Sequence, residues 1–152
     1  MPQPFAIEAG PRYEGPHGPI AVPADQAPDS TRVELPGGHA KLAWGMASDD
    51  RAALEQGVPA QIGGRELVLA LRGRTLELQD PSGAPTAVAS RRRGRITIER
   101  PDGTALAWFK PAELAGEVAE EATPDDVAFM LLLLASNAGS VLERRVPLPF
   151  LQ

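Results

Sequence analysis

The chain contains no cysteine, and this absence excludes several kinds of site at once. With none among 152 residues, a disulfide, a zinc-thiolate centre and a cysteine nucleophile are all ruled out. Histidine is nearly as scarce, because His17 and His39 are the only two. We interpret each as a solvated turn residue, since two separated histidines make neither a metal cluster nor a catalytic triad. We therefore expect no metal and no cofactor, and a reducing, cytoplasmic location.

Motifs for nucleotide binding and for catalysis are absent too. The glycine-containing turns match neither GxxxxGK[ST] nor GxGxxG, so no phosphate-binding loop is predicted. Adjacent carboxylates occur, but neighbouring residues on a helix point about 100° apart and do not form an acid-base couple by spacing alone. These pairs are Asp49/Asp50, Glu120/Glu121 and Asp125/Asp126. We predict that the protein is not an enzyme.

Positive charge is in deficit. The 15 Lys and Arg residues against 20 Asp and Glu residues give a formal net charge of −5. Because nucleic acid phosphates require clustered cations, such a chain has no general attraction for nucleic acid. The N-terminal sequence MPQPFAIEAGPRYEG lacks the basic start and the continuous apolar stretch of an export signal. We expect neither a nucleic-acid partner nor export.

Proline and glycine, by contrast, are abundant, with 16 and 15 residues, and they predict many turns and few long helices. Seven of the prolines fall within residues 1–30, which we interpret as an extended or disordered arm. Alternatively, Phe5, Ile7 and Tyr13 attach this arm as an edge strand to the body or to a partner chain. We assign residues 31–145 to one domain and residues 146–152 to an apolar tail.

Two consecutive segments repeat one another at an offset of 20 residues. LELQDPSGAPTAVA (76–89) aligns without a gap with ITIERPDGTALAWF (96–109). We interpret each as a β-hairpin whose proline takes the first central turn position. The glycine then ends a type I turn or occupies a positive-φ bulge. A third, weaker copy, residues 34–44, aligns if Lys41 is a bulge. Together the three hairpins predict a β-meander.

Shorter segments complete a mainly β domain of roughly seven to nine strands. The strand ELVLAL (66–71) is apolar on both faces, so we expect it to be covered on both sides. Ser48 is predicted to cap a short helix that stops at Gly57. The segment PAELAGEVAEEA (111–122) predicts a second helix with its apolar residues on one side and its glutamates in water.

The most strongly marked helix is TPDDVAFMLLLLAS, residues 123–136. Thr123 suits the N-cap and Pro124 the first helical position, and the following nine residues from Val127 carry no polar side-chain atom. A membrane span needs about 20 apolar residues, so this segment is too short to cross a bilayer. A helix that is apolar on every side must then be surrounded by protein, which places residues 124–136 inside a curled sheet.

The fold class that follows is mainly β (β+α), an antiparallel, hairpin-built barrel or strongly curled sheet around a hydrophobic C-terminal helix. LELQDPSGAPTAVASRRRGRITIERPDGTALAWF and DDVAFMLLLLAS resemble the tubby C-terminal fold, which phospholipid scramblase-like and LURP-one-related proteins share. The resemblance covers about residues 31–140 and implies a twelve-stranded barrel. A rival arrangement lays the helix on one face of an open sheet and covers its other side with a second subunit.

A basic cluster stands out from this acidic chain. Such a density of positive charge can hold an anionic lipid headgroup or another anionic ligand, and the tubby resemblance implies the same kind of ligand. The alternative is a solvated basic turn that balances nearby acidic residues. The cluster lies within ten residues and consists of Arg91, Arg92, Arg93, Arg95 and Arg100, with Arg72 and Arg74 as further candidates.

The tail contains the segment VPLPFL, residues 146–151, whose two prolines are incompatible with a helix. It is suited to be a docking peptide or a swapped strand for a protein partner or a second copy, or it packs against its own domain. The contact residues would be Val146, Leu148, Phe150 and Leu151. Two functions therefore remain open: an anion-binding domain, or a protein interaction or assembly module that uses the arm and the tail.

Overall fold

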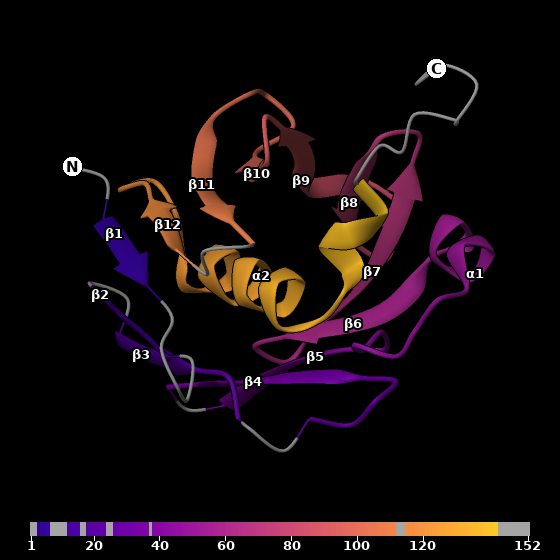
Figure 1. Cartoon of the computed structure of the whole chain (residues 1–152), viewed down its shortest axis with the longest axis horizontal. Helices are drawn as coiled ribbons and strands as arrows, with labels where there is room; N and C mark the ends of the chain where they lie inside the picture. Colours follow the sequence, from indigo (N-terminus) through magenta and orange to yellow (C-terminus); the bar gives the residue numbers. More distant parts are fainter. Residues whose placement is uncertain are drawn as a thin grey trace, which may run out of the picture.

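The fold is known from a computed structural model, which describes residues 3–6, 12–15, 18–23, 26–36, 38–111 and 115–142. Its strands form one antiparallel sheet of 12 strands, in the order β1-β12-β11-β10-β9-β8-β7-β6-β5-β4-β3-β2. Figure 1 shows these strands arranged around helix α2. Their bounds are β1 Gln3–Ala6, β2 Arg12–Gly15, β3 Gly18–Ala21, β4 Thr31–Leu35, β5 Gly38–Leu42, β6 Val58–Ile62, β7 Arg65–Arg72, β8 Thr75–Gln79, β9 Pro85–Arg92, β10 Arg95–Glu99, β11 Ala105–Lys110 and β12 Ala115–Val118.

In the sheet, the first strand of the chain lies beside the last one. From β2 to β12 each strand pairs with the next one along the chain, whereas β1 pairs with β12. β1 and β2 also lie close to one another, but within the described residues no backbone pairing joins them. A mainly β fold of antiparallel hairpins is thus confirmed, and the predicted seven to nine strands were too few.

The proline-rich segment, residues 1–30, accounts for part of the difference between the predicted and the observed number of strands. β1, β2 and β3 all fall within residues 1–30 and belong to the same sheet as the rest of the chain. Ile20 of β3 has no exposed surface and is part of the common core. The described part of the arm is therefore a strand-forming portion of the domain, although Ile7 lies outside the described residues.

The turns of the two repeated hairpins follow their sequence closely. The backbone N–H of Gly83 donates to the carbonyl of Asp80 at 2.9 Å, and that of Gly103 donates to the carbonyl of Arg100 at 2.9 Å. The two glycines have φ values of 89° and 93°. The register of each hairpin shifts beside its turn, as expected for a bulge with a glycine in the left-handed region. Both predicted hairpins are confirmed.

The third hairpin, β4 with β5, is also present, but the predicted bulge at Lys41 is wrong. Its register runs without a shift from Thr31 opposite Leu42 to Leu35 opposite Gly38, and it places Lys41 opposite Arg32. The pairing of Leu35 with Gly38 leaves fewer residues for the turn than the pairing of Glu99 with Ala105 in the second repeated hairpin. The extra residue of the alignment therefore extends the paired strands, and no bulge is needed.

Helix α1 (Arg51–Gln56) differs from its prediction only at its start. The carboxylate of Asp50 accepts from the N–H of Ala53 at 3.2 Å and caps the helix, whereas Ser48 accepts from the N–H of Gly45 at 2.9 Å. Gly57, with φ of 106°, ends the helix as predicted. α1 packs on the outer face of β7, which explains why that strand is apolar on both sides.

The predicted helix at residues 111–122 is wrong, because residues 115–118 form β12 between β1 and β11. A side chain at Gly116 would overlap the carbonyl oxygen of Trp108, so glycine is needed for the two strands to approach. Val118 is 1% exposed and faces the core. Leu114 and Val118 share a helical spacing, but backbone pairing on two sides outweighs that pattern, and glycine is in any case a poor helix former.

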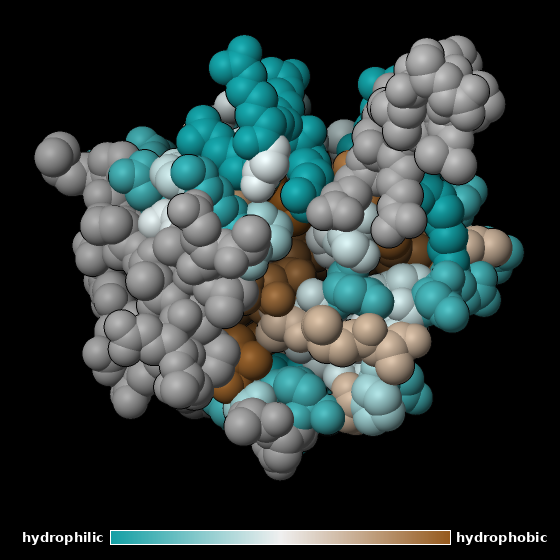
Figure 2. Space-filling model, viewed as in Figure 1, coloured by the Kyte–Doolittle hydropathy of each residue, from teal (hydrophilic) through white to brown (hydrophobic). Residues whose placement is uncertain are grey.

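Helix α2 (Pro124–Ala135) is confirmed, and it lies in the hydrophobic core around which the strands are arranged. Thr123 and Asp126 make a reciprocal capping box at its start. Every residue from Asp126 to Leu133 is buried, and the helix contacts β3, β4, β5, β6 and β11. Figure 2 shows hydrophobic residues at the centre of the molecule, where α2 lies in Figure 1. In the part of the chain that the structure describes, no helix has the length and apolarity to cross a membrane.

Candidate functional site

Two neighbouring turns carry most of the predicted arginine cluster. The β9–β10 turn joins Arg92 to Arg95, which lie opposite one another. The β7–β8 turn contains Arg74, and the pairing of Thr75 with Ser90 places this turn beside the end of β9. The strand register therefore brings together two basic turns that are 20 residues apart. We call Arg74, Arg92, Arg93 and Arg95 the arginine rim.

Three members of the arginine rim have exposed side chains with no partner in the described part of the chain. Arg74, Arg92 and Arg93 make no hydrogen bond or ion pair with any other residue that the structure describes. Arg93 has a φ of 51° and precedes Gly94 with a φ of 80°, the left-handed pair that a tight hairpin turn requires. Asparagine or glycine is usual at such a position, so Arg93 occupies a backbone conformation that its side chain disfavours.

Arg95 is held over an aromatic ring on the outer face of the sheet. Its guanidinium lies 4.6 Å from the ring centroid of Trp108, a cation-π contact. The indole N–H of Trp108 donates to Glu117 on β12 at 3.0 Å, which fixes the ring. A surface pocket of about 630 Å³ adjoins this stack, and it is lined by Arg92, Arg93, Arg95, Thr97, Glu99 and Lys110. Figure 2 shows hydrophilic residues over β10 and β11 at the top of the view.

The other predicted arginines are placed differently. Arg91 lies opposite the buried Ile96, so it belongs to the inner face of the sheet and is half-buried. Arg72 lies on the outer face near the rim and donates to the backbone carbonyl of Glu55 at 3.0 Å. Neither is counted in the arginine rim, because Arg72 already has a hydrogen-bond partner and Arg91 lies on the inner face and has a partner of its own.

Arg100 lies at the opposite end of β10 and does not join the cluster. Its guanidinium binds both carboxylate oxygens of Asp126, at 3.2 Å and 2.9 Å. The same carboxylate accepts from the backbone N–H of Thr123 at 2.8 Å and from its hydroxyl at 3.0 Å. Arg100 therefore connects the β10–β11 turn to the start of α2, and its grouping with the other arginines was wrong.

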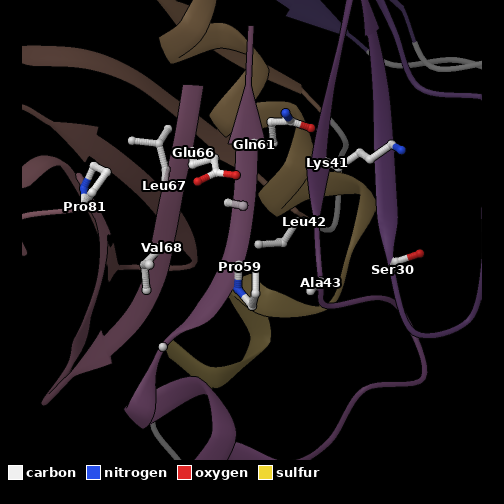
Figure 3. Close-up of a pocket in the computed structure, with 12 residues that line it drawn as sticks. Ser30, Lys41, Leu42, Ala43, Pro59, Gln61, Glu66, Leu67, Val68 and Pro81 are labelled. Atoms are coloured by element: carbon white, nitrogen blue, oxygen red, sulfur yellow. The ribbon is translucent and has the colours of Figure 1, made fainter. Parts of the chain in front are cut away.

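A second candidate site is a groove of about 580 Å³ on the outer face of β5, β6 and β7. Its polar row crosses the three strands, because Gln61 lies opposite both Lys41 and Glu66. Figure 3 shows Gln61 between Glu66 and Lys41, with the side chain of Lys41 extending away from Gln61. We call this surface the β5–β7 groove.

The apolar row of the β5–β7 groove runs parallel to the polar one. Pro59 lies opposite Val68, and the backbone N–H of Ala43 donates to the carbonyl of Pro59 at 2.9 Å. Gly57, directly after α1, borders the groove at one end, so α1 covers the adjoining part of β7. The sequence prediction missed this site, because each strand contributes only one or two outward residues to it.

His39 is half-buried beside the β4–β5 turn, and the described residues hold no group of three side chains able to bind a metal ion. His17 and the tail residues Val146, Leu148, Phe150 and Leu151 lie outside the described residues. No family model, curated protein or solved structure significantly matches this chain.

Proposed function

We propose that this protein is a non-enzymatic binding domain whose arginine rim recognises the phosphate groups of an anionic lipid headgroup. The observation that carries the proposal is a set of three exposed guanidinium groups on two adjacent turns, none of which has a partner among the residues that the structure describes. In a protein with a net charge of −5, most basic side chains are expected to be neutralised by nearby carboxylates. Unpaired arginines at one place therefore favour an external anion.

The chemistry of the rim suits phosphate. A guanidinium group offers parallel N–H donors that match two phosphate oxygens, and it stays charged at any physiological pH. The contact with Trp108 orients Arg95 without using its in-plane donors, so these donors remain available to a ligand. Phosphate oxygens held between the two turns would meet several cations at once, which gives an affinity that falls with added salt.

The resemblance to the tubby C-terminal fold supports the same ligand class. The 12 strands and the central hydrophobic helix are the architecture that this resemblance implies. We include in the proposal that the sheet is a closed barrel, with β1 and β2 as its last neighbouring pair. A domain of this kind presents its turns at a rim, where a headgroup can be reached from solvent.

Removing two rim charges is expected to weaken binding to anionic vesicles. The double variant Arg92→Gln/Arg93→Asn should bind phosphoinositide-containing vesicles roughly 30-fold more weakly, since each basic residue near an anionic surface contributes about 1 kcal/mol. Its thermal stability should be equal or higher, because asparagine tolerates the left-handed conformation of Arg93. Co-sedimentation at low and physiological salt measures the binding, and calorimetry measures the stability.

The matched control is Arg32→Gln/Arg65→Gln, which changes the net charge equally but lies away from the arginine rim beside Glu34 and Asp125. This control should retain at least half of the wild-type binding. A soluble inositol phosphate should compete with the vesicles, while competition by inorganic phosphate alone would identify a free anion as the ligand. Equal sedimentation with neutral and anionic vesicles would refute the proposal.

A further inference from the structure

We infer that Glu99 makes the arginine rim selective for a headgroup that carries a hydrogen-bond donor, an ammonium or a hydroxyl group, next to its phosphate. This selectivity rests on the proposed function and names the class of headgroup that the rim would take. Three features of Glu99 point to it: its place in the pocket beside the rim, the absence of a partner for its carboxylate in the described part of the chain, and its distance from the guanidinium groups.

The pocket of about 630 Å³ beside the rim has two ends of opposite charge. Arg92, Arg93 and Arg95 line it where β9 turns into β10, whereas Glu99 lines it at the other end of β10. Arg95, Thr97 and Glu99 alternate with the buried residues of β10, so all three point outward on the same face. A ligand that fills the pocket would therefore meet cations at one end and a carboxylate at the other.

The carboxylate of Glu99 makes no hydrogen bond or ion pair with another residue that the structure describes, although the side chain is half-buried. Its neighbours on the adjoining strands are Val88 and Ala105, whose side chains carry no donor. Arg100, the next residue in the chain, directs its guanidinium to Asp126 instead. A carboxylate that is partly withdrawn from water is stabilised by a donor, so an N–H or O–H group of a ligand can fill this role.

The spacing between the two charges suits one small headgroup. The guanidinium of Arg95 lies 4.6 Å from the ring centroid of Trp108, and Trp108 pairs with Thr97. The guanidinium therefore lies near the level of Thr97, two residues before Glu99 along β10. Two residues of a strand span about 7 Å, which is too far for a direct ion pair. A phosphate bound to Arg95 can instead place a donor group, attached a few bonds away, beside Glu99.

Headgroups with and without a donor respond to Glu99 in opposite ways. A phosphate that carries no donor group is repelled by the carboxylate, so Glu99 weakens its binding. A headgroup whose ammonium or hydroxyl group reaches Glu99 forms a charge-assisted hydrogen bond, which offsets the repulsion. Glu99 therefore gives the rim a specificity that the arginines alone do not have.

Glu99→Gln is expected to change the two kinds of binding in opposite directions. The variant should bind phosphatidylcholine vesicles that contain phosphatidic acid about fivefold more tightly, because one repelling charge near the surface is removed. It should bind vesicles that contain a donor-bearing lipid roughly threefold more weakly, because the donor contact is lost. The two lipids to compare are phosphatidylserine, with an ammonium group, and phosphatidylinositol, with hydroxyl groups; a loss confined to one of them identifies the donor. Co-sedimentation at equal vesicle surface potential measures the binding.

The matched control is Glu77→Gln. Glu77 is also half-buried and has Val88 as a neighbour, as Glu99 does, but it does not line the pocket. This control loses the same charge and should bind every anionic vesicle as tightly as the wild type or slightly more tightly. Thermal unfolding of both variants checks that the fold is retained. If Glu99→Gln bound all anionic vesicles more tightly, the selectivity would be refuted and the proposed function would stand. If the wild type bound no anionic vesicle, both would be refuted.

Discussion

Leu132→Glu is expected to abolish folding. Leu132 is 1% exposed at the middle of α2, and it is surrounded by the apolar side chains of the core. An ionised carboxylate at this position would have no partner, and burying such a group without compensation costs several kcal/mol. Loss of the leucine contacts adds about 2–5 kcal/mol. The sum approaches or exceeds the entire stability of a domain, about 5–15 kcal/mol.

Circular dichroism and thermal unfolding measure the outcome. The variant should lack a cooperative transition and should accumulate in the insoluble fraction. Leu134→Glu is the matched control, since Leu134 lies on the same helix but is only partly buried. It should remain folded with a reduced melting temperature. A soluble, cooperatively folded Leu132→Glu protein would contradict the placement of α2 in the core.

The features of the fold that were predicted correctly are those that local chemistry determines. The carboxylate of Asp80 accepts from the N–H groups of Ser82 and Ala84, at 2.9 Å and 3.1 Å, so the first repeated turn is stabilised by residues inside it. The hydrogen bond from the Ser82 hydroxyl, above all, holds the pKa of Asp80 below its ordinary value. The cap of α2 by Thr123 is similarly local. Such elements can be predicted from a few adjacent residues.

The errors concern features that depend on distant segments. β12 is a strand because β1 and β11 pair with its two edges, and nothing within residues 111–122 indicates these partners. All four members of the arginine rim were among the predicted arginines, but the prediction also included Arg72, Arg91 and Arg100, which the structure places elsewhere. The contribution of Arg74 depends on the register of β8 with β9, and the β5–β7 groove depends on three strands at once.

Arg100 shows how a repeat can conceal a difference in role. It occupies the turn position that Asp80 occupies in the first hairpin, and the backbone bonds of the two turns are equivalent. Asp80 bonds to its own turn, whereas the longer side chain of Arg100 leaves its turn and reaches Asp126 on α2. Asp102 takes over the local role in the second turn by accepting from the N–H of Thr104 at 2.9 Å. Sequence proximity therefore grouped Arg100 with side chains that point elsewhere.

Arg100→Met is expected to lower the free energy of unfolding by about 2–3 kcal/mol. The change would leave the carboxylate of Asp126, whose side chain is 8% exposed, with only the donors of Thr123. Removing one partner of a fully buried pair costs about 3–5 kcal/mol, and we expect a smaller cost here because Arg100 is 34% exposed and water can partly replace it. For a chain of 152 residues this predicts a decrease in melting temperature of roughly 4–12 °C.

Arg65→Met provides a control of the same chemistry at the same helix terminus. Arg65 pairs with Asp125 at 3.2 Å, but the two side chains are 57% and 40% exposed, so its loss should cost less than about 1 kcal/mol. In a double-mutant cycle, Arg100→Met should destabilise an Asp126→Asn protein less than it destabilises the wild type, because the buried charge is already gone. Urea unfolding of the four proteins measures this coupling. Equal effects of Arg100→Met and Arg65→Met would show that the bidentate contact does not stabilise the start of α2, and that Arg100 is available to a ligand after all.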